Sequence, residues 1–190
     1  MELLATTRGQ DDDLHTCVVA ESARRGDASA LRTLLEQDSA HANRVDATGS
    51  SALMHASEAG QAECCSVLLA GGADPHLQRT SDGATALGLA AANGKPGSIH
   101  VLLQHDPGLV NSTDGSGRTA LHHAVAAGSF NTAKYLLGRW GADDALPDAQ
   151  GDTPLHLCTT RALLLLLAHG PPNRPLARLG KLTNRSGQTP

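Results

Sequence analysis

Ten histidines and four cysteines are the residues of this 190-residue chain that could bind a metal ion or act as nucleophiles. The most suggestive group is the adjacent pair His122 and His123, together with His156. A zinc hydrolase motif requires two histidines four positions apart with a glutamate between them, and that pattern does not occur in this sequence. We therefore expect no metal centre and no cofactor.

The cysteines are Cys17, Cys64, Cys65 and Cys158. An adjacent pair such as Cys64 and Cys65 is not typical of a disulfide framework, and the other spacings do not resemble a metal clamp. We expect all four to be reduced thiols that behave as small, buried apolar side chains.

The charge and hydropathy of the chain exclude several classes of partner. A net charge of −4 and a pI near 6.2 predict no direct binding of nucleic acid, which usually requires a basic face. The longest apolar run, 162–168, is much shorter than the ~20 residues of a membrane span, so we expect no membrane insertion. Residues 1–13 form an acidic tail without the features of a signal or transit peptide. We predict a cytoplasmic protein and leave nuclear or cytoskeletal association open.

A repeat of 34 residues dominates the rest of the sequence. Each repeat begins with a glycine that opens a similar phrase, at Gly49, Gly83, Gly117 and Gly151. The first three of these are followed eleven residues later by a second glycine, and eight residues after that by a Leu-Leu pair. A fixed period in this range is typical of an array of stacked structural units.

Each unit has the signals of two short helices. Thr85, Thr119 and Thr153 can cap the first turn of a helix, and Pro154 suits the position that follows a cap. The second glycine ends this first helix, and a second helix leads into the Leu-Leu pair. Recurring leucines, such as Leu87 and its equivalents, form one apolar face that such a pair cannot bury by itself. The pairs must therefore stack on one another.

This pattern resembles the ankyrin repeat family, whose signature Gly-x-Thr-Pro-Leu-His-x-Ala is nearly matched at 151–157. The resemblance implies an all-α solenoid of about five helix–turn–helix repeats, with projecting β-turn loops and a concave groove. His122 and His156 match the signature histidine, to which the family assigns structural hydrogen bonds, whereas Met54 and Gly88 differ from it.

The predicted repeats lie near 14–46, 47–80, 81–114, 115–148 and 149–170. The first is a diverged cap, and the fifth has lost four residues between its helices, around 159–163. Residues 171–190 are predicted to be irregular and to start an incomplete sixth repeat.

The resemblance also implies where a partner would bind: at the loop tips and at the exposed end of each first helix. These positions are occupied by Arg24, Arg25, Thr48, Ser50, Glu58, Ser81, Asp82, Asn93, Ser116, Arg118, Gln150, Asp152 and Arg161. Small residues form the middle of this surface and arginines lie toward its ends, which favours a partner segment that carries acidic side chains.

Trp140 is the only tryptophan, and it lies at the outer end of the fourth repeat, away from the groove. Two roles remain open for it. It either covers the end of its helix or marks a second contact surface, because tryptophan is frequent at interface hot spots.

A stack of short helices offers no enclosed pocket for a nucleophile and its base, and the glycines mark repeats rather than a phosphate-binding loop. We therefore expect neither enzymatic activity nor a small-molecule substrate. The sequence predicts a non-catalytic protein–protein interaction module, an adaptor or scaffold, whose partner is another protein. It leaves open a structural subunit of a large assembly and a regulatory inhibitor of an enzyme or transcription factor.

Overall fold

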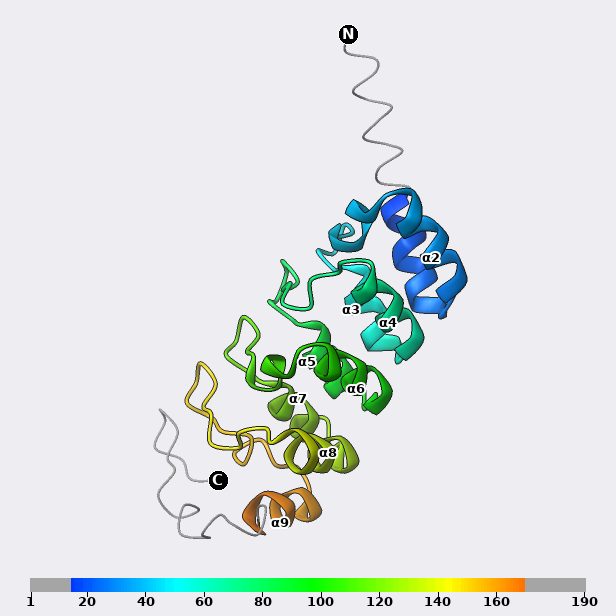
Figure 1. Ribbon diagram of the computed structural model, residues 1–190. Coiled ribbons are helices and arrows are strands. Elements are labelled where there is room, and N and C mark those ends of the chain that lie inside the picture. The colour runs from blue at the N-terminus through cyan, green and yellow to red at the C-terminus, as the bar shows by residue number, and fades with distance from the viewer. Residues whose placement is uncertain (1–14, 170–190) are drawn as a thin grey trace.

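The computed structural model describes residues 15–169 (Figure 1). The predicted acidic tail 1–13 and the predicted irregular segment 171–190 lie outside the described residues.

Pairs of short helices follow one another along the described chain. The first pair consists of residues 15–25 and α2 (Ala28–Gln37). The next pairs are α3 (Ala52–Ala59) with α4 (Ala62–Ala70), α5 (Ala86–Ala92) with α6 (Pro96–His105), and α7 (Ala120–Ala126) with α8 (Phe130–Trp140). The last described helix is α9 (Arg161–His169), and short 3-10 helices occur at η1 (Ser39–Asn43) and η2 (Pro107–Asn111).

The helices form two layers (Figure 1). In the inner layer α3 packs on α5 and α5 on α7, while in the outer layer α2 packs on α4 and α4 on α6. The recurring leucines Leu53, Leu87 and Leu121 are at most 1% exposed, so the apolar faces of neighbouring pairs cover each other as the sequence predicts. The all-α solenoid is confirmed.

Finger loops project from the inner layer to one side of the stack (Figure 1). Within residues 15–169, extended pairing is limited to isolated bridges that close three of these loops: Val45 with Ser51, Gln78 with Thr85 and Thr113 with Thr119. We call the loops 45–51, 78–85, 113–119 and 148–152 fingers 2 to 5. Backbone hydrogen bonds link the last three fingers, from Gly115 N to Gly83 O (3.2 Å) and from Ala149 N to Ser116 O (2.9 Å).

The predicted helix caps are correct in two of three repeats. The side chain of Thr85 accepts a hydrogen bond from the N–H of Gly88 (3.1 Å), and Thr119 is the N-cap residue of α7. The predicted helix after Thr153 is wrong, because residues 154–157 form a turn. In it the N–H groups of His156, Leu157 and Cys158 donate to the carbonyls three residues earlier. The four-residue loss leaves too little chain for a first helix before α9 begins.

The burial of the cysteine side chains is only partly as predicted. Cys64 and Cys65 are buried and all four thiols are free, but Cys17 is exposed and Cys158 is half-buried.

On α9, Leu163 and Leu167 are buried whereas Leu164 and Leu165 are 41% and 46% exposed.

The contact between fingers 3 and 4 can be tested at Gly83. Its φ is +71°, and an added Cβ would lie 2.4 Å from the backbone nitrogen of Gly115. We expect Gly83→Ala to lower the free energy of unfolding in urea by about 2 to 4 kcal/mol, from backbone strain and overpacking together.

Gly72→Ala is the matched control, because its φ is +88° and nothing lies within 4 Å of an added Cβ. It should lose only the strain, about 1 kcal/mol. Equal losses in the two variants would show that the fingers do not pack closely.

Candidate functional site

A polar pocket of about 230 Å³ lies where fingers 3 and 4 meet the inner helices α5 and α7. We call it the groove pocket. Its walls come from finger residues and its floor from helix residues, two of which are small. The lining consists of Arg79, Asp82, Ala84, Asp114, Ser116 and Arg118 from the fingers, and Gly88, Leu89, Ala92 and His123 from the helices.

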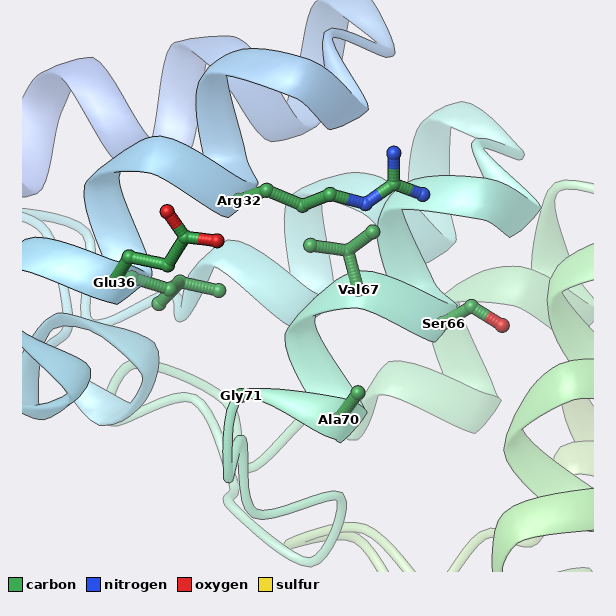
Figure 2. Close-up of a pocket in the computed structure, with 7 residues that line it drawn as sticks. Arg32, Glu36, Ser66, Val67, Ala70 and Gly71 are labelled. Carbon is green, nitrogen blue, oxygen red and sulfur yellow. The ribbon is translucent and has the colours of Figure 1, made fainter.

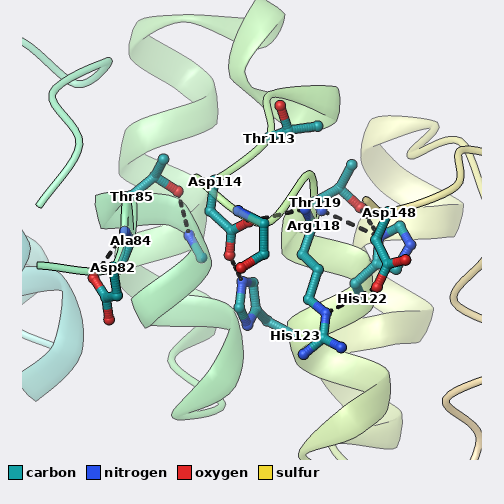
Figure 3. A network of polar contacts seen from close by, with 12 residues as sticks. Asp82, Ala84, Thr85, Thr113, Asp114, Arg118, Thr119, His122, His123 and Asp148 are labelled. Carbon is teal, nitrogen blue, oxygen red and sulfur yellow. Dashed lines mark hydrogen bonds and ion pairs between the residues drawn. The ribbon is translucent and has the colours of Figure 1, made fainter. Parts of the chain in front are cut away.

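Aspartates fix the fingers to the inner helices. One oxygen of Asp114 accepts hydrogen bonds from the N–H groups of Ser116 (2.8 Å) and Arg118 (2.9 Å), and the other lies 2.8 Å from Nε2 of His123 (Figure 3). A carboxylate three residues before the periodic glycine thus shapes the turn and ties it to a helix.

Finger 2 is held in the same way. Asp46 accepts from Thr48 and Ser50, and it lies 2.7 Å from Nε2 of His55. Partial burial opposes ionisation of Asp46, but hydrogen bonds from Thr48, His55 and the backbone outweigh it and hold its pKa well below the ordinary value. The Asp46 carboxylate therefore remains charged at neutral pH.

The third repeat differs at the matching positions, and the pocket results from these differences. Thr80 replaces the finger aspartate, and Leu89 replaces the histidine that would bind it. Finger 3 is held instead by Arg79, whose Nε and Nη2 donate to Asp82 at 2.8 and 2.6 Å. These hydrogen bonds lower the pKa of Asp82 to about 2.

Gly88 has no side chain to fill the pocket. A Cβ at this position would lie 3.2 Å from Cδ2 of His123, so the ring of His123 closes over a space that the signature histidine would otherwise enter. Ala92, further along the same helix, also lines the pocket and has too small a side chain to fill it.

Arg118 has unused hydrogen-bonding capacity beside this pocket. Its Nε donates to Asp148 (3.1 Å), whose side chain is fully buried, while the Arg118 side chain is 36% exposed (Figure 3). Its Nη groups have no hydrogen-bond partner among residues 15–169. A guanidinium held at one nitrogen can accept a carboxylate from another molecule with the other two.

His122 has a structural role, as the resemblance implies. Its Nδ1 accepts a hydrogen bond from the N–H of Thr119 (3.1 Å), and its Nε2 lies 3.1 Å from the carbonyl oxygen of Asp152 in finger 5. Burial lowers the pKa of His122. The neutral ring therefore links the fourth repeat to the fifth.

The predicted contact residues mostly lie at the surface. Ten are exposed: Arg24, Arg25, Thr48, Glu58, Ser81, Asp82, Asn93, Ser116, Gln150 and Arg161. Arg118, Asp152 and Trp140 are half-buried. Ser50 must be removed from the set, because it is 2% exposed and its N–H and hydroxyl bond to Asp46 and Thr48 within finger 2.

The structure does not bring the predicted arginines together. Arg24 and Arg25 both pair with Glu21, at 3.4 and 2.7 Å, at the first-repeat end of the solenoid. Arg118 alone of the predicted arginines lines the groove pocket. The prediction missed Arg79, Leu89 and His123, although an aspartate nine residues before His55 and before His123 is a signal that the sequence contains.

Trp140 lies at the end of α8 in the outer layer and packs partly against the core. The centre of the Trp140 ring is 6.0 Å from the centre of the His100 ring, and the guanidinium carbon of Arg139 is 5.8 Å from the Trp140 ring centre. Its Nε1 is buried without a hydrogen-bond partner within the described part of the chain. This packing favours the first predicted role, cover for the helix end.

Three features of the described residues concern metal ions, membranes and the reactivity of the thiols. No group of three or more His, Cys, Asp or Glu side chains in 15–169 could hold a metal ion, and none of the helices there is long and apolar enough to cross a membrane. Burial raises the pKa of the Cys158 thiol to about 11, and burial also raises the pKa of Cys65. A protonated thiol is a weak nucleophile.

Stacked helix pairs with fingers on one side, and a polar pocket between fingers and helices, define a helical-repeat protein with a binding face. A family model described as ankyrin repeats (3 copies) matches residues 2–79, 68–148 and 87–177. The chain therefore belongs to the ankyrin repeat family, whose members bind other proteins.

Several curated proteins are similar to this chain. Target of rapamycin complex 2 subunit AVO2 from Saccharomyces cerevisiae is 33% identical over 73% of this chain and 33% of its own length. E3 ubiquitin-protein ligase KEG from Arabidopsis thaliana is 32% identical over 72% of this chain and 8% of its own. Inversin from Homo sapiens is 31% identical over 78% of this chain and 11% of its own. The chain thus spans a third or less of these relatives.

The buried histidine gives a pH dependence that can be measured. The pKa of folded His122 lies below the ordinary 6.5, so the unfolded chain binds this proton first as the pH falls. Its contribution to stability is complete above pH 6.5 and is lost below that value. We expect the free energy of unfolding in urea to fall less between pH 7.5 and 5.5 for His122→Asn than for the wild type.

Ala124→Gly is the control for reduced overall stability, because it weakens the same helix by about 1 kcal/mol without changing a titratable group. It should keep the wild-type pH dependence. An unchanged pH dependence in His122→Asn would contradict the assignment.

Proposed function

We propose that this chain is a non-catalytic adaptor or scaffold that binds a segment of a partner protein through the finger tips and the ends of the inner helices. One observation carries the proposal: a pocket whose polar groups are already held in place, with the Nη groups of Arg118 left without a partner among the described residues. Groups fixed before binding lose little conformational freedom when a partner arrives.

An acidic side chain of the partner would enter the groove pocket and pair with Arg118. Asp148 is already paired with Arg118, and the oxygens of Asp114 are occupied by hydrogen bonds from the backbone of finger 4 and by the contact with His123. Ala92 lets the partner's backbone approach closely, since its side chain is only a methyl group at the pocket floor. A desolvated arginine in the centre of an interface is a frequent hot spot.

A permanent subunit of a large assembly is the second candidate. It is favoured by the similarity to a yeast protein named as a subunit of target of rapamycin complex 2. The same groove pocket would serve either role, but a permanent subunit would co-purify in fixed stoichiometry. Cytoplasmic location, the absence of nucleic-acid binding and the regulatory-inhibitor alternative stay predictions.

The proposal can be tested by placing a carboxylate in the groove pocket. Ala92→Glu adds bulk at the pocket floor and offers Arg118 an internal partner, so it should weaken binding of specific partners about tenfold or more. The measurement is affinity purification of the full chain from cells with quantitative mass spectrometry, followed by titration of each recovered partner.

Asn131→Glu is the control, because it places a carboxylate at an exposed position of α8 in the outer layer, away from the finger tips, the inner-helix ends and the pocket. The thermal midpoints of both variants should be measured to exclude misfolding. Partners recovered equally well by Ala92→Glu and wild type would overturn the proposal. Co-elution of a partner at constant stoichiometry through high salt would select the permanent subunit over the adaptor.

A further inference from the structure

A second hollow surface lies on the outer helices and is separate from the groove pocket. Between α2 and α4 there is an open cavity of about 510 Å³ (Figure 2). Its lining is apolar in the middle and charged on one rim, and consists of Arg32, Leu35, Glu36, Ser66, Val67, Ala70 and Gly71. Ser66 and Ala70 are exposed on α4 and too small to fill the space.

A second cavity of about 240 Å³ lies on the other side of α4, against α6. It shares Ser66 and Ala70 with the first, and Leu69, Val101, Gln104 and His105 complete its lining. The two cavities therefore lie side by side across a low ridge on α4.

The next interval along the outer layer, between α6 and α8, is occupied by aromatic side chains. The hydroxyl of Tyr135 lies 3.0 Å from Nδ1 of His100, and the Trp140 ring packs beside the same histidine. Large side chains thus fill one interval of the outer layer, while small side chains leave the two preceding intervals hollow.

The charge around the first cavity favours a cation. The Nη2 of Arg32 pairs with Glu63 at 3.1 Å, and the Arg32 side chain extends along the rim away from Glu36 (Figure 2). Glu36 forms no ion pair within residues 15–169. It lies in the last turn of α2, and neither α2 nor α4 has a basic residue in its last turn. The carbonyl ends of two helices and the Glu36 carboxylate therefore face this space, and the positive charge in its lining, Arg32, is already paired with Glu63.

We propose that this outer surface docks an amphipathic helix of a partner protein. Adjacent packed helices lie roughly 8 to 10 Å apart, which is close to the ~10.5 Å rise of seven residues in a helix. Two apolar side chains seven residues apart on the partner helix enter the two cavities. A lysine or arginine beside the first of them pairs with Glu36, its aliphatic stem lying on Leu35 and Val67.

This docking surface is independent of the groove pocket, so the chain can hold two partners, or two segments of one partner, at once. The surfaces use different helix layers: the groove pocket uses α5 and α7, and the outer surface uses α2, α4 and α6.

The test uses the full chain and a displayed library of helical peptides of about 18 residues, with one face randomised. Helices selected by the wild type are titrated against variants by fluorescence anisotropy. Ala70→Arg places a long, positively charged side chain between the two cavities, where it obstructs a docked helix and repels its basic residue. We expect it to weaken binding of the selected helices about tenfold or more. Glu36→Gln should weaken them about threefold, the effect of one exposed ion pair.

Two controls introduce matched changes elsewhere in the outer layer. Asn131→Arg places the same side chain at an exposed position of α8, and Lys134→Gln removes an exposed charge from that helix. Both should bind the selected helices like the wild type.

The expected sequences carry apolar residues at i and i+7 and a basic residue near the first. Selection that yields only helices insensitive to Ala70→Arg, or only helices without a basic residue, overturns the proposal. Ala92→Glu should leave binding of these helices unchanged, so failure of the outer surface is distinguished from failure of the groove pocket.

Discussion

Two helices of seven to eleven residues cannot bury the leucines and alanines that line one side of each, and the structure depends on neighbouring pairs to do so. Leu53, Leu87 and Leu121 are almost fully covered because each lies between two units. Ala56, Ala90 and Ala124 are 0% exposed and permit the close approach that this packing requires. Stability is therefore shared among repeats, and exposed positions of each repeat are free to vary.

The groove pocket results from such variation between repeats at exposed positions. In the second and fourth repeats an aspartate and a histidine tie the finger to its helix, and their side chains occupy the surface. The third repeat has Thr80 and Leu89 at these positions, and its finger is held by an ion pair between Arg79 and Asp82 within the finger itself. A change in how one finger is held thus leaves a hollow beside Arg118.

The fold could be predicted from the sequence because its signals are local and repeated: glycines at a constant spacing and threonines that cap helices. The fifth repeat misled the prediction, since Thr153 to His156 match the signature although the chain behind them is too short for a helix. Ser50 was misplaced because proximity to a turn glycine does not reveal burial. The groove pocket could not be predicted, because Arg79 and Arg118 are 39 positions apart and meet only through stacking.

The backbone bonds that join fingers 3, 4 and 5 have a consequence for the entropy of binding. Isolated loops each lose conformational freedom when a partner fixes them, at a cost of about 1 to 2 kcal/mol per ordered residue. Loops that are already joined have lost much of that freedom during folding. A partner lying along this edge therefore meets a continuous ledge rather than three separate loops, and more of its contact energy appears as affinity.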